Sequence, residues 1–384
     1  MKRSTDRILV AHQGTLPRPD DLRDMLSARS SGHPYDRAAL AERLQRAVQE
    51  AVQQQVACGI DVVNDGEMSK TSFSDYVSDR LGGLAPTDEP YVSPINGRDL
   101  RDFPEYFASR RGVGNRQAIG YRRVVFQCVA PLTYIGQHAV QTDIANLKAA
   151  LANVNVEEAY LPAVAPGSIA HWLKNAYYKN DEEFLYAIAE AMHEEYKAIV
   201  DAGFLLQIDD PDLADGWQVH PHLTLEAYRQ VAESQTAVLN HALHAIPADR
   251  VRMLMCWGSY HGPHKYDLPL RDFVDIVLQV QADSYSIEAS NPRHAHEWRV
   301  WEEVKLPPGK QLVPGVVGHC SDFIEHPELI AERLVTYGRL IGRENIMAGT
   351  DCGLGTRVGH GAIALAKFQA LAEGARLASQ RLWR

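Results

Sequence analysis

Basic charge is scarce in this 384-residue chain, which carries 39 Lys and Arg against 49 Asp and Glu, a formal net charge of -10. No stretch gathers the Lys and Arg side chains that would neutralise phosphates, so we expect no nucleic-acid partner and no anionic membrane surface. Long hydrophobic runs are also lacking near the start, where only Ile8 to Ala11 precede His12. That run is too short for a signal-peptide core or a membrane span, and we predict a cytoplasmic protein.

Cysteine is rare too, with five residues at irregular spacing. An odd, scattered set in a long chain favours a reducing compartment over a disulfide framework. Glycine-rich phosphate loops are missing as well. No Gly-x-Gly-x-x-Gly follows the first expected strand, and no loop of the Gly-Lys-Ser or Gly-Lys-Thr type occurs. Their absence argues against the usual nucleotide-binding sites.

A repeated order of helix, turn and short apolar strand is present along the chain, and the strands end in polar residues. Such alternation implies parallel strands, because parallel pairing needs long crossovers. Polar groups after the strands predict an α/β fold of the (β/α)8 barrel type, with a doubly wound sheet as the second choice. We predict one barrel domain over residues 1–384, with an excursion at about residues 81–120. The expected helices span residues 38–57, 181–201, 270–281 and 327–341.

Two thiols and one carboxylate stand at strand ends in the second half of the chain. Cys256 follows the apolar run 253–255, Cys352 comes soon after the apolar run 346–348, and Glu288 ends a strand between them. The carboxyl ends of barrel strands meet at one face, so we expect these side chains to converge. Cysteine and glutamate are both zinc ligands. The pattern therefore predicts a zinc site formed by Cys256, Glu288 and Cys352.

Six short motifs in a fixed order carry a resemblance to a known family. They are Gly14-Thr15-Leu16-Pro17-Arg18-Pro19, Asp65-Gly66-Glu67, Ile208-Asp209-Asp210-Pro211, Cys256-Trp257-Gly258, Ile287-Glu288 and Asp351-Cys352-Gly353-Leu354. With these motifs the chain resembles the C-terminal catalytic barrel of cobalamin-independent methionine synthase. It is more closely similar to the single-barrel relatives that include epoxyalkane:coenzyme M transferase. The resemblance covers nearly the whole chain and implies a TIM barrel of the uroporphyrinogen decarboxylase/methionine synthase type, without the N-terminal barrel of the full-length synthase.

In that family a His-x-Cys pair, a glutamate and a distal cysteine hold zinc, which implies Cys256, Glu288 and Cys352 as three of the ligands. The fourth does not match, because Leu254 stands where the family has histidine. Three outcomes are open: three protein ligands with one open position, replacement by a nearby histidine, or loss of the metal. The nearby histidines are His261, His264 and His319.

The resemblance also implies residues that hold the substrate. Thr15, Glu67 and Asp209 match positions that would bind an amino-acid-like thiol, with the two carboxylates facing its ammonium group. Asp209 and His319 are the predicted catalytic residues, His319 as a proton donor to a leaving group. From the residues alone, Arg293 in its polar turn is a candidate for binding a substrate carboxylate or sulfonate. The alternative interpretation of that turn is the start of a surface helix.

These features predict a zinc-dependent thiol alkyltransferase that transfers a methyl or alkyl group to a thiol such as homocysteine. A free thiol has a pKa of ~8.5 and is a poor nucleophile at neutral pH until something deprotonates it, which zinc coordination does. The alternatives are an enzyme like epoxyalkane:coenzyme M transferase, and a lyase or other non-transferase enzyme with an altered or absent metal site, which Leu254 favours. The expected partners are a small-molecule thiol and an alkyl donor, and a homo-oligomer is left open.

Overall fold

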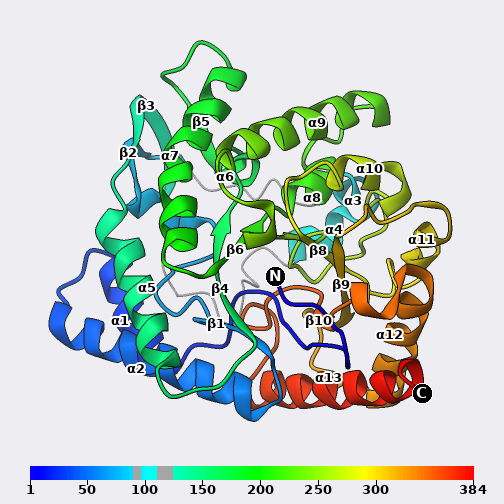
Figure 1. Ribbon diagram of the computed structural model, residues 1–384. Helices are drawn as coiled ribbons and strands as arrows, with labels where there is room; N and C mark the ends of the chain where they lie inside the picture. The colour runs from blue at the N-terminus through cyan, green and yellow to red at the C-terminus, as the bar shows by residue number, and fades with distance from the viewer. Residues whose placement is uncertain (90–96, 110–123) are drawn as a thin grey trace.

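A parallel sheet of seven strands stands at the centre of the computed structural model, which describes residues 1–89, 97–109 and 124–384 (Figure 1). Every pairing in this sheet is parallel, and the strands follow one another in chain order. Helical crossovers between the strands make this order feasible. The strands are β1 (Val62–Asn64), β4 (Glu158–Val164), β6 (Leu205–Asp209), β7 (Val251–Met255), β8 (Ser284–Glu288), β9 (Gln311–Val317) and β10 (Gly349–Thr350).

The N-terminal segment joins the two edges of this sheet. Val10 forms a parallel bridge with Ala348, just before β10, and Ala11 forms one with Val62 in β1. The amide of Ala11 donates to the carbonyl of Ala348 over 2.8 Å, and the amide of Val62 donates to the carbonyl of Val10 over 3.1 Å. The barrel prediction is confirmed, with the eighth position of the ring held by isolated bridges instead of a full strand.

Helices cover the outer face of the curled sheet. Local signals start several of them: the carboxylate of Asp36 accepts from the amides of Ala38 and Ala39, and Asn180 and Thr224 cap their helices in the same way. Within the described ranges no helix has the length and apolar character needed to cross a membrane. The helices are α1 (Asp20–Ser30), α2 (Arg37–Ala57), α5 (Gln137–Leu151), α6 (Pro166–Trp172), α7 (Asp181–Asp201), α8 (Asp212–Val219), α9 (Leu225–Ala242), α10 (Val274–Val277), α11 (Val300–Glu303), α12 (Pro327–Ile341) and α13 (Gly361–Leu382).

Three of the expected helices match α2, α7 and α12 closely, and the fourth does not. Residues 270–281 form a 3-10 turn, η3 (Leu270–Asp272), followed by the single turn of α10. Phe273 separates the two with φ -152° and ψ 3°, outside the helical region. Its side chain is fully buried, so packing decides the backbone here and overrides the apolar periodicity.

Two apolar clusters form the core. The larger one unites the helices with one face of the sheet. The smaller one contains Leu9, Ala11, Val62, Tyr160, Leu205, Val313 and Met347 and includes no residue of the helices, so it fills the inside of the ring. Alternation along a strand explains the division, because Val10 belongs to the outer cluster while Leu9 and Ala11 belong to the inner one.

A second, three-stranded sheet takes one strand from the predicted excursion. Strand β2 (Leu81–Thr87) pairs antiparallel with β3 (Val125–Tyr134), which pairs parallel with β5 (Leu173–Asn175). Two short helices, α3 (Asp99–Asp102) and α4 (Pro104–Ser109), lie between β2 and β3 in the chain. Residues 90–96 and 110–120 of the excursion lie outside the described residues. Organisation as one domain stays a prediction.

Buried ionic contacts hold this small sheet to the barrel. Arg80, at the start of β2, donates to Asp143 of α5 over 2.5 Å and to Glu195 of α7 over 3.0 Å. The hydroxyl groups of Tyr76 and Tyr134 donate to Glu195 as well. All three charged side chains are less than a tenth exposed. Each charge is tolerable there only because its partners are in place.

Replacing Arg80 with Met should therefore lower the free energy of unfolding by about 3–5 kcal/mol, because Asp143 and Glu195 would remain buried without their cation. Arg46→Met is the matched control, since Arg46 pairs with Glu42 on an exposed helix face. That change should cost less than about 1 kcal/mol. Urea unfolding measures both, and equal midpoints for the two variants would contradict the assignment.

Candidate active site

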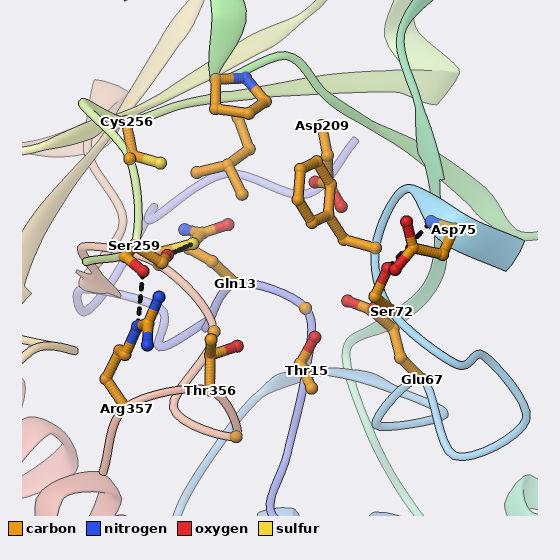
Figure 2. Close-up of a pocket in the computed structure, with 18 of the residues that line it drawn as sticks. Gln13, Thr15, Glu67, Ser72, Asp75, Asp209, Cys256, Ser259, Thr356 and Arg357 are labelled. Atoms are coloured by element: carbon orange, nitrogen blue, oxygen red, sulfur yellow. Dashed lines mark hydrogen bonds between the residues drawn. The ribbon is translucent and has the colours of Figure 1, made fainter. Parts of the chain in front are cut away.

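A cavity of about 320 Å3 opens at the carboxyl ends of the barrel strands. Thr15, Glu67, Asp209, Cys256 and Cys352 line it, so the structure brings together five of the residues singled out in the sequence. They come from the N-terminal segment and from the ends of β1, β6, β7 and β10. Figure 2 shows Cys256 and Ser259 on one side of the cavity and Glu67 on the other.

Two buried carboxylates form the acidic side. Asp209 is the last residue of β6, and one of its oxygens accepts from the Gln207 side-chain amide over 2.7 Å. Burial, and after it the nearby charge of Glu67, raises the pKa of Asp209 to about 7. Glu67 is 2% exposed, and its Oε2 has no hydrogen-bond partner among the described residues. The positive charges of Lys70 and Arg252 lower the pKa of Asp209, but burial and Glu67 outweigh them.

The backbone of Glu67 is strained in the conformation that places its side chain at the cavity. Glu67 has φ 54°, in the left-handed region that costs a non-glycine residue free energy and that gathers at functional sites. Its carboxylate packs directly against Gly14, leaving no room for a Cβ there. On the other flank of the N-terminal segment, a Cβ at Gly355 would lie 2.5 Å from the carbonyl carbon of Leu16. These glycines let three segments meet at the cavity.

Two thiols form the opposite side. Cys256 follows β7 directly, and Cys352 lies two residues after β10. A hydrogen bond with the Cys352 thiol, then burial and the charge of Glu288, raise the pKa of Cys256 well above its ordinary value. Ser259 Oγ donates to Cys352 Sγ over 3.4 Å. A nearby cation would favour the thiolate form of Cys256.

Glu288 lies behind these thiols, at the end of β8. Its Oε2 accepts from the amide of Trp257 over 2.9 Å, and its Oε1 accepts from the Asn291 side chain over 3.1 Å. The side chain is 2% exposed. Each oxygen accepts one printed hydrogen bond in this way and has a further lone pair, so the carboxylate can also bind a cation.

Asp351 fixes the neighbourhood of Glu288 and was not singled out in the sequence as a site residue. Its carboxylate accepts from the amides of Ala289, Ser290 and Asn291 over 2.9, 2.9 and 3.1 Å, and from the Ser290 hydroxyl over 2.5 Å. Burial and then Glu288 raise the pKa of Asp351 to about 7. One side chain after β10 thus orders the turn after β8. Its place directly before Cys352 was the only signal in the sequence.

His319, two residues after β9, stands beside both carboxylates. One ligand atom each from Glu288, His319 and Asp351 lie within 4.8 Å of one another, and the described part of the chain has no other such group of three. The predicted trio of Cys256, Glu288 and Cys352 is therefore not gathered to this distance. Burial lowers the pKa of His319 to about 4, so the imidazole is neutral at pH 7. Its predicted role as a proton donor stays a prediction.

The other predicted positions are placed differently. Leu254 lines the cavity two residues before Cys256 and offers no metal-binding atom. Arg293 is exposed and donates to the carbonyl of Lys265 over 2.7 Å, and it does not line the cavity. His264 uses both ring nitrogens, with Asp267 at 2.6 Å and the carbonyl of Tyr260 at 3.3 Å. His261 is exposed.

Comparison with known proteins agrees with the resemblance seen in the motifs. A model of the family described as the cobalamin-independent synthase catalytic domain matches residues 127–374. A methionine synthase of Saccharolobus solfataricus is 24% identical over 377 residues, which cover 97% of this chain and 95% of the relative. One from Sulfurisphaera tokodaii is 23% identical over 342 residues, 89% of this chain and 84% of the relative.

A solved structure shows the same fold. It is that of a B12-independent methionine synthase from Shewanella sp. W3-18-1 in complex with selenomethionine, with a TM-score of 0.73 and 19% identity over 98% of this chain and 99% of that one.

The bonds of Asp351 predict the effect of changing it to Asn. An amide nitrogen would then face at least one of the four donors, so a buried donor would lose its partner and the free energy of unfolding should fall by about 1–3 kcal/mol. Asp322→Asn is the control, because Asp322 is exposed and accepts one hydrogen bond, from the amide of Gly359. Urea unfolding compares the two, and an unchanged Asp351→Asn midpoint would refute the role given to this carboxylate.

Proposed function

The chain belongs to the family of cobalamin-independent synthase catalytic domains, and from that premise we propose that it is a zinc-dependent S-methyltransferase acting on an amino thiol such as homocysteine. The observation that carries the proposal is the layout of the cavity. Two thiols that follow β7 and β10 line the same cavity as two buried carboxylates, from the ends of β1 and β6. An amino thiol has a sulfur atom for the thiol side of the cavity and an ammonium group for the carboxylate side.

Cys256, Glu288 and Cys352 would hold the zinc. The raised pKa of Cys256 supports this, because a buried pair of thiols becomes a pair of thiolates only next to a cation. Glu288 supports it too, because its charge raises the pKa of Cys256 and each of its oxygens has a lone pair left for a cation. When bound, zinc supplies the positive charge that keeps an acceptor thiol deprotonated at neutral pH.

Glu67 and Asp209 would bind the ammonium group of the acceptor. An ammonium between the two carboxylates relieves their repulsion and favours the ionised form of Asp209, whose pKa is about 7 in its absence. Thr15, on the adjoining wall, would bind the amino-acid end through its hydroxyl. The related Shewanella synthase holds selenomethionine, which also carries an ammonium group, and this supports the assignment.

The charge of the cavity weighs against an anionic thiol such as coenzyme M. Two arginines line the cavity, and both are engaged with backbone carbonyls: Arg18 donates to those of Glu67 and Lys70 over 2.7 Å each, and Arg357 donates to that of Ser259. Arg293, the candidate for binding a sulfonate, lies outside the cavity lining. A sulfonate on the acidic side of the cavity would meet Glu67 and Asp209 at close range, which is repulsive.

A metal-free lyase or other non-transferase enzyme is the second candidate, and Leu254 is the observation that favours it, since it removes one donor from the family's ligand set. We also propose a cytoplasmic location. All five cysteines are free thiols, which supports a reducing compartment.

Metal content separates the two candidates. We expect about one equivalent of zinc per chain in protein purified without chelators, lost in Cys256→Ser and in Cys352→Ser because each removes a thiolate ligand. Cys58→Ser is the control and should keep its zinc, since Cys58 is a buried thiol that donates to the carbonyl of Leu365. Elemental analysis by mass spectrometry gives the stoichiometry. Zinc-free wild-type protein would rule out the metal and leave the second candidate.

Acceptor binding should depend on the ionisation of Asp209. Homocysteine binds best when Asp209 is charged, so below pH 7 its affinity should fall by up to about tenfold per pH unit more than deprotonation of the acceptor thiol alone requires. Asp209→Asn should remove this additional dependence and weaken binding about 10–100-fold, the loss of one charge-assisted bond. Titration calorimetry between pH 6 and 8 measures both.

Asp210→Asn is a close control for this experiment. The pKa of Asp210 is also raised to about 7, by burial and then by Asp212, but its carboxylate accepts from Ser168 and does not line the cavity. The Asp210→Asn protein should keep the pH dependence. Tighter binding of coenzyme M than of homocysteine would show that the acceptor class is wrong.

A further inference from the structure

The zinc site proposed above has one fewer imidazole than the family's ligand set. Leu254 and Cys256 lie two residues apart along the end of β7, and both line the cavity. Residue 254 therefore lies where a metal ligand is expected, but its leucine side chain has no lone pair to donate to a metal. The inference that follows rests on the proposed metal and concerns which side chain supplies the missing donor.

His319 is a buried imidazole whose environment gives it no hydrogen bond. It is 2% exposed, and neither Nδ1 nor Nε2 has a partner within the described ranges. Buried polar atoms are satisfied in the great majority of cases, so two orphaned nitrogens on one ring require an explanation. A metal ion is a partner that satisfies an imidazole nitrogen without a hydrogen bond.

The other buried histidines of the described chain are already engaged. His264 and His294 both pair with Asp267, and His294 also contacts Glu297 at 2.9 Å. His12 contacts the Gln55 side chain at 2.7 Å through Nε2. Of the alternatives open from the sequence, His261 is exposed and His264 is held by two partners. His319 is the histidine left with both ring nitrogens available.

The position of His319 in the barrel also suits a metal ligand. Strand β9 lies between β8, which ends at Glu288, and β10, which leads to Cys352. A ligand atom of His319 is within 4.8 Å of one on Glu288. Neither Cys256 nor Cys352 belongs to that group of three, so the four side chains would have to move together around the ion. Asp351 is the third member of that group, but its carboxylate already accepts four hydrogen bonds. Glu288 and His319 are therefore the members that remain free to bind a cation.

We propose that His319 binds the metal in place of the missing histidine, so that Cys256, Glu288, His319 and Cys352 form the ligand set. The donor composition is then two sulfurs, one oxygen and one nitrogen, as in the family, and the imidazole enters from β9 instead of β7. Zinc has no geometric preference from its d electrons and tolerates such a change of direction. This assignment replaces the prediction that His319 is a proton donor.

Zinc affinity measured by chelator competition tests the proposal on the full chain. His319→Ala should lower affinity by at least about 10–100-fold, because loss of a partner behind a ligand already has that effect. Adding Leu254→His to His319→Ala should restore most of it, since the donor returns at the family position. His264→Asn is the control and should keep wild-type affinity; Asn tolerates the left-handed backbone of residue 264, where φ is 52°.

Cobalt substitution gives a second readout that does not depend on activity. The visible absorption of bound Co2+ should change in His319→Ala and return toward wild type in the double variant, and rescue by Leu254→His shows that the fold is intact. His319→Ala protein that keeps wild-type zinc affinity while its turnover falls would overturn the ligand role and leave the zinc-dependent function standing. Zinc absent from the wild type, with intact Cys256 and Cys352, would overturn the metal site as a whole.

Discussion

Closure of the parallel strands into a ring is the constraint on which the cavity depends. Val10 and Ala11 bridge the two edges of the sheet, which brings the ends of β1 and β10 to either side of the N-terminal segment. Glu67 and Cys352 are thereby placed around one cavity although they are far apart in the chain. Parallel strands all end on the same face, so each polar residue that follows a strand adds to the same site.

The two sides of the cavity share one electrostatic property: on each side, burial opposes the charged form of one side chain. Burial and Glu67 raise the pKa of Asp209, while the Cys352 thiol, burial and Glu288 raise the pKa of Cys256. Desolvation penalises the charged form in both cases. An ammonium group on one side and a metal on the other would reverse both shifts. The raised pKa values of Asp209 and Cys256 therefore indicate that a positively charged group binds on each side of the cavity.

Much of this arrangement could be predicted from the sequence, because Asp209, Cys256, Glu288 and Cys352 lie at the ends of apolar strands or within two residues of them, and their position depends on topology. What failed depends on the path of a loop. Arg293 lies in a turn that directs it to the carbonyl of Lys265. The pairing of β2 with β3 joins segments separated by more than 30 residues, and no local pattern encodes such contacts.

Leu254 has a consequence beyond the number of ligands. Its side chain is 5% exposed and lines the cavity beside Cys256. An apolar wall at this point keeps water from the sulfur pair, and electrostatic interactions are stronger where water is excluded. The exclusion of water would strengthen the attraction between the thiolates and a cation. Without a cation it would make the thiolate forms less stable. An imidazole that enters from β9 instead of β7 would thus keep the same kinds of metal-donor atom. It would also leave the apolar side chain of Leu254 facing the substrate.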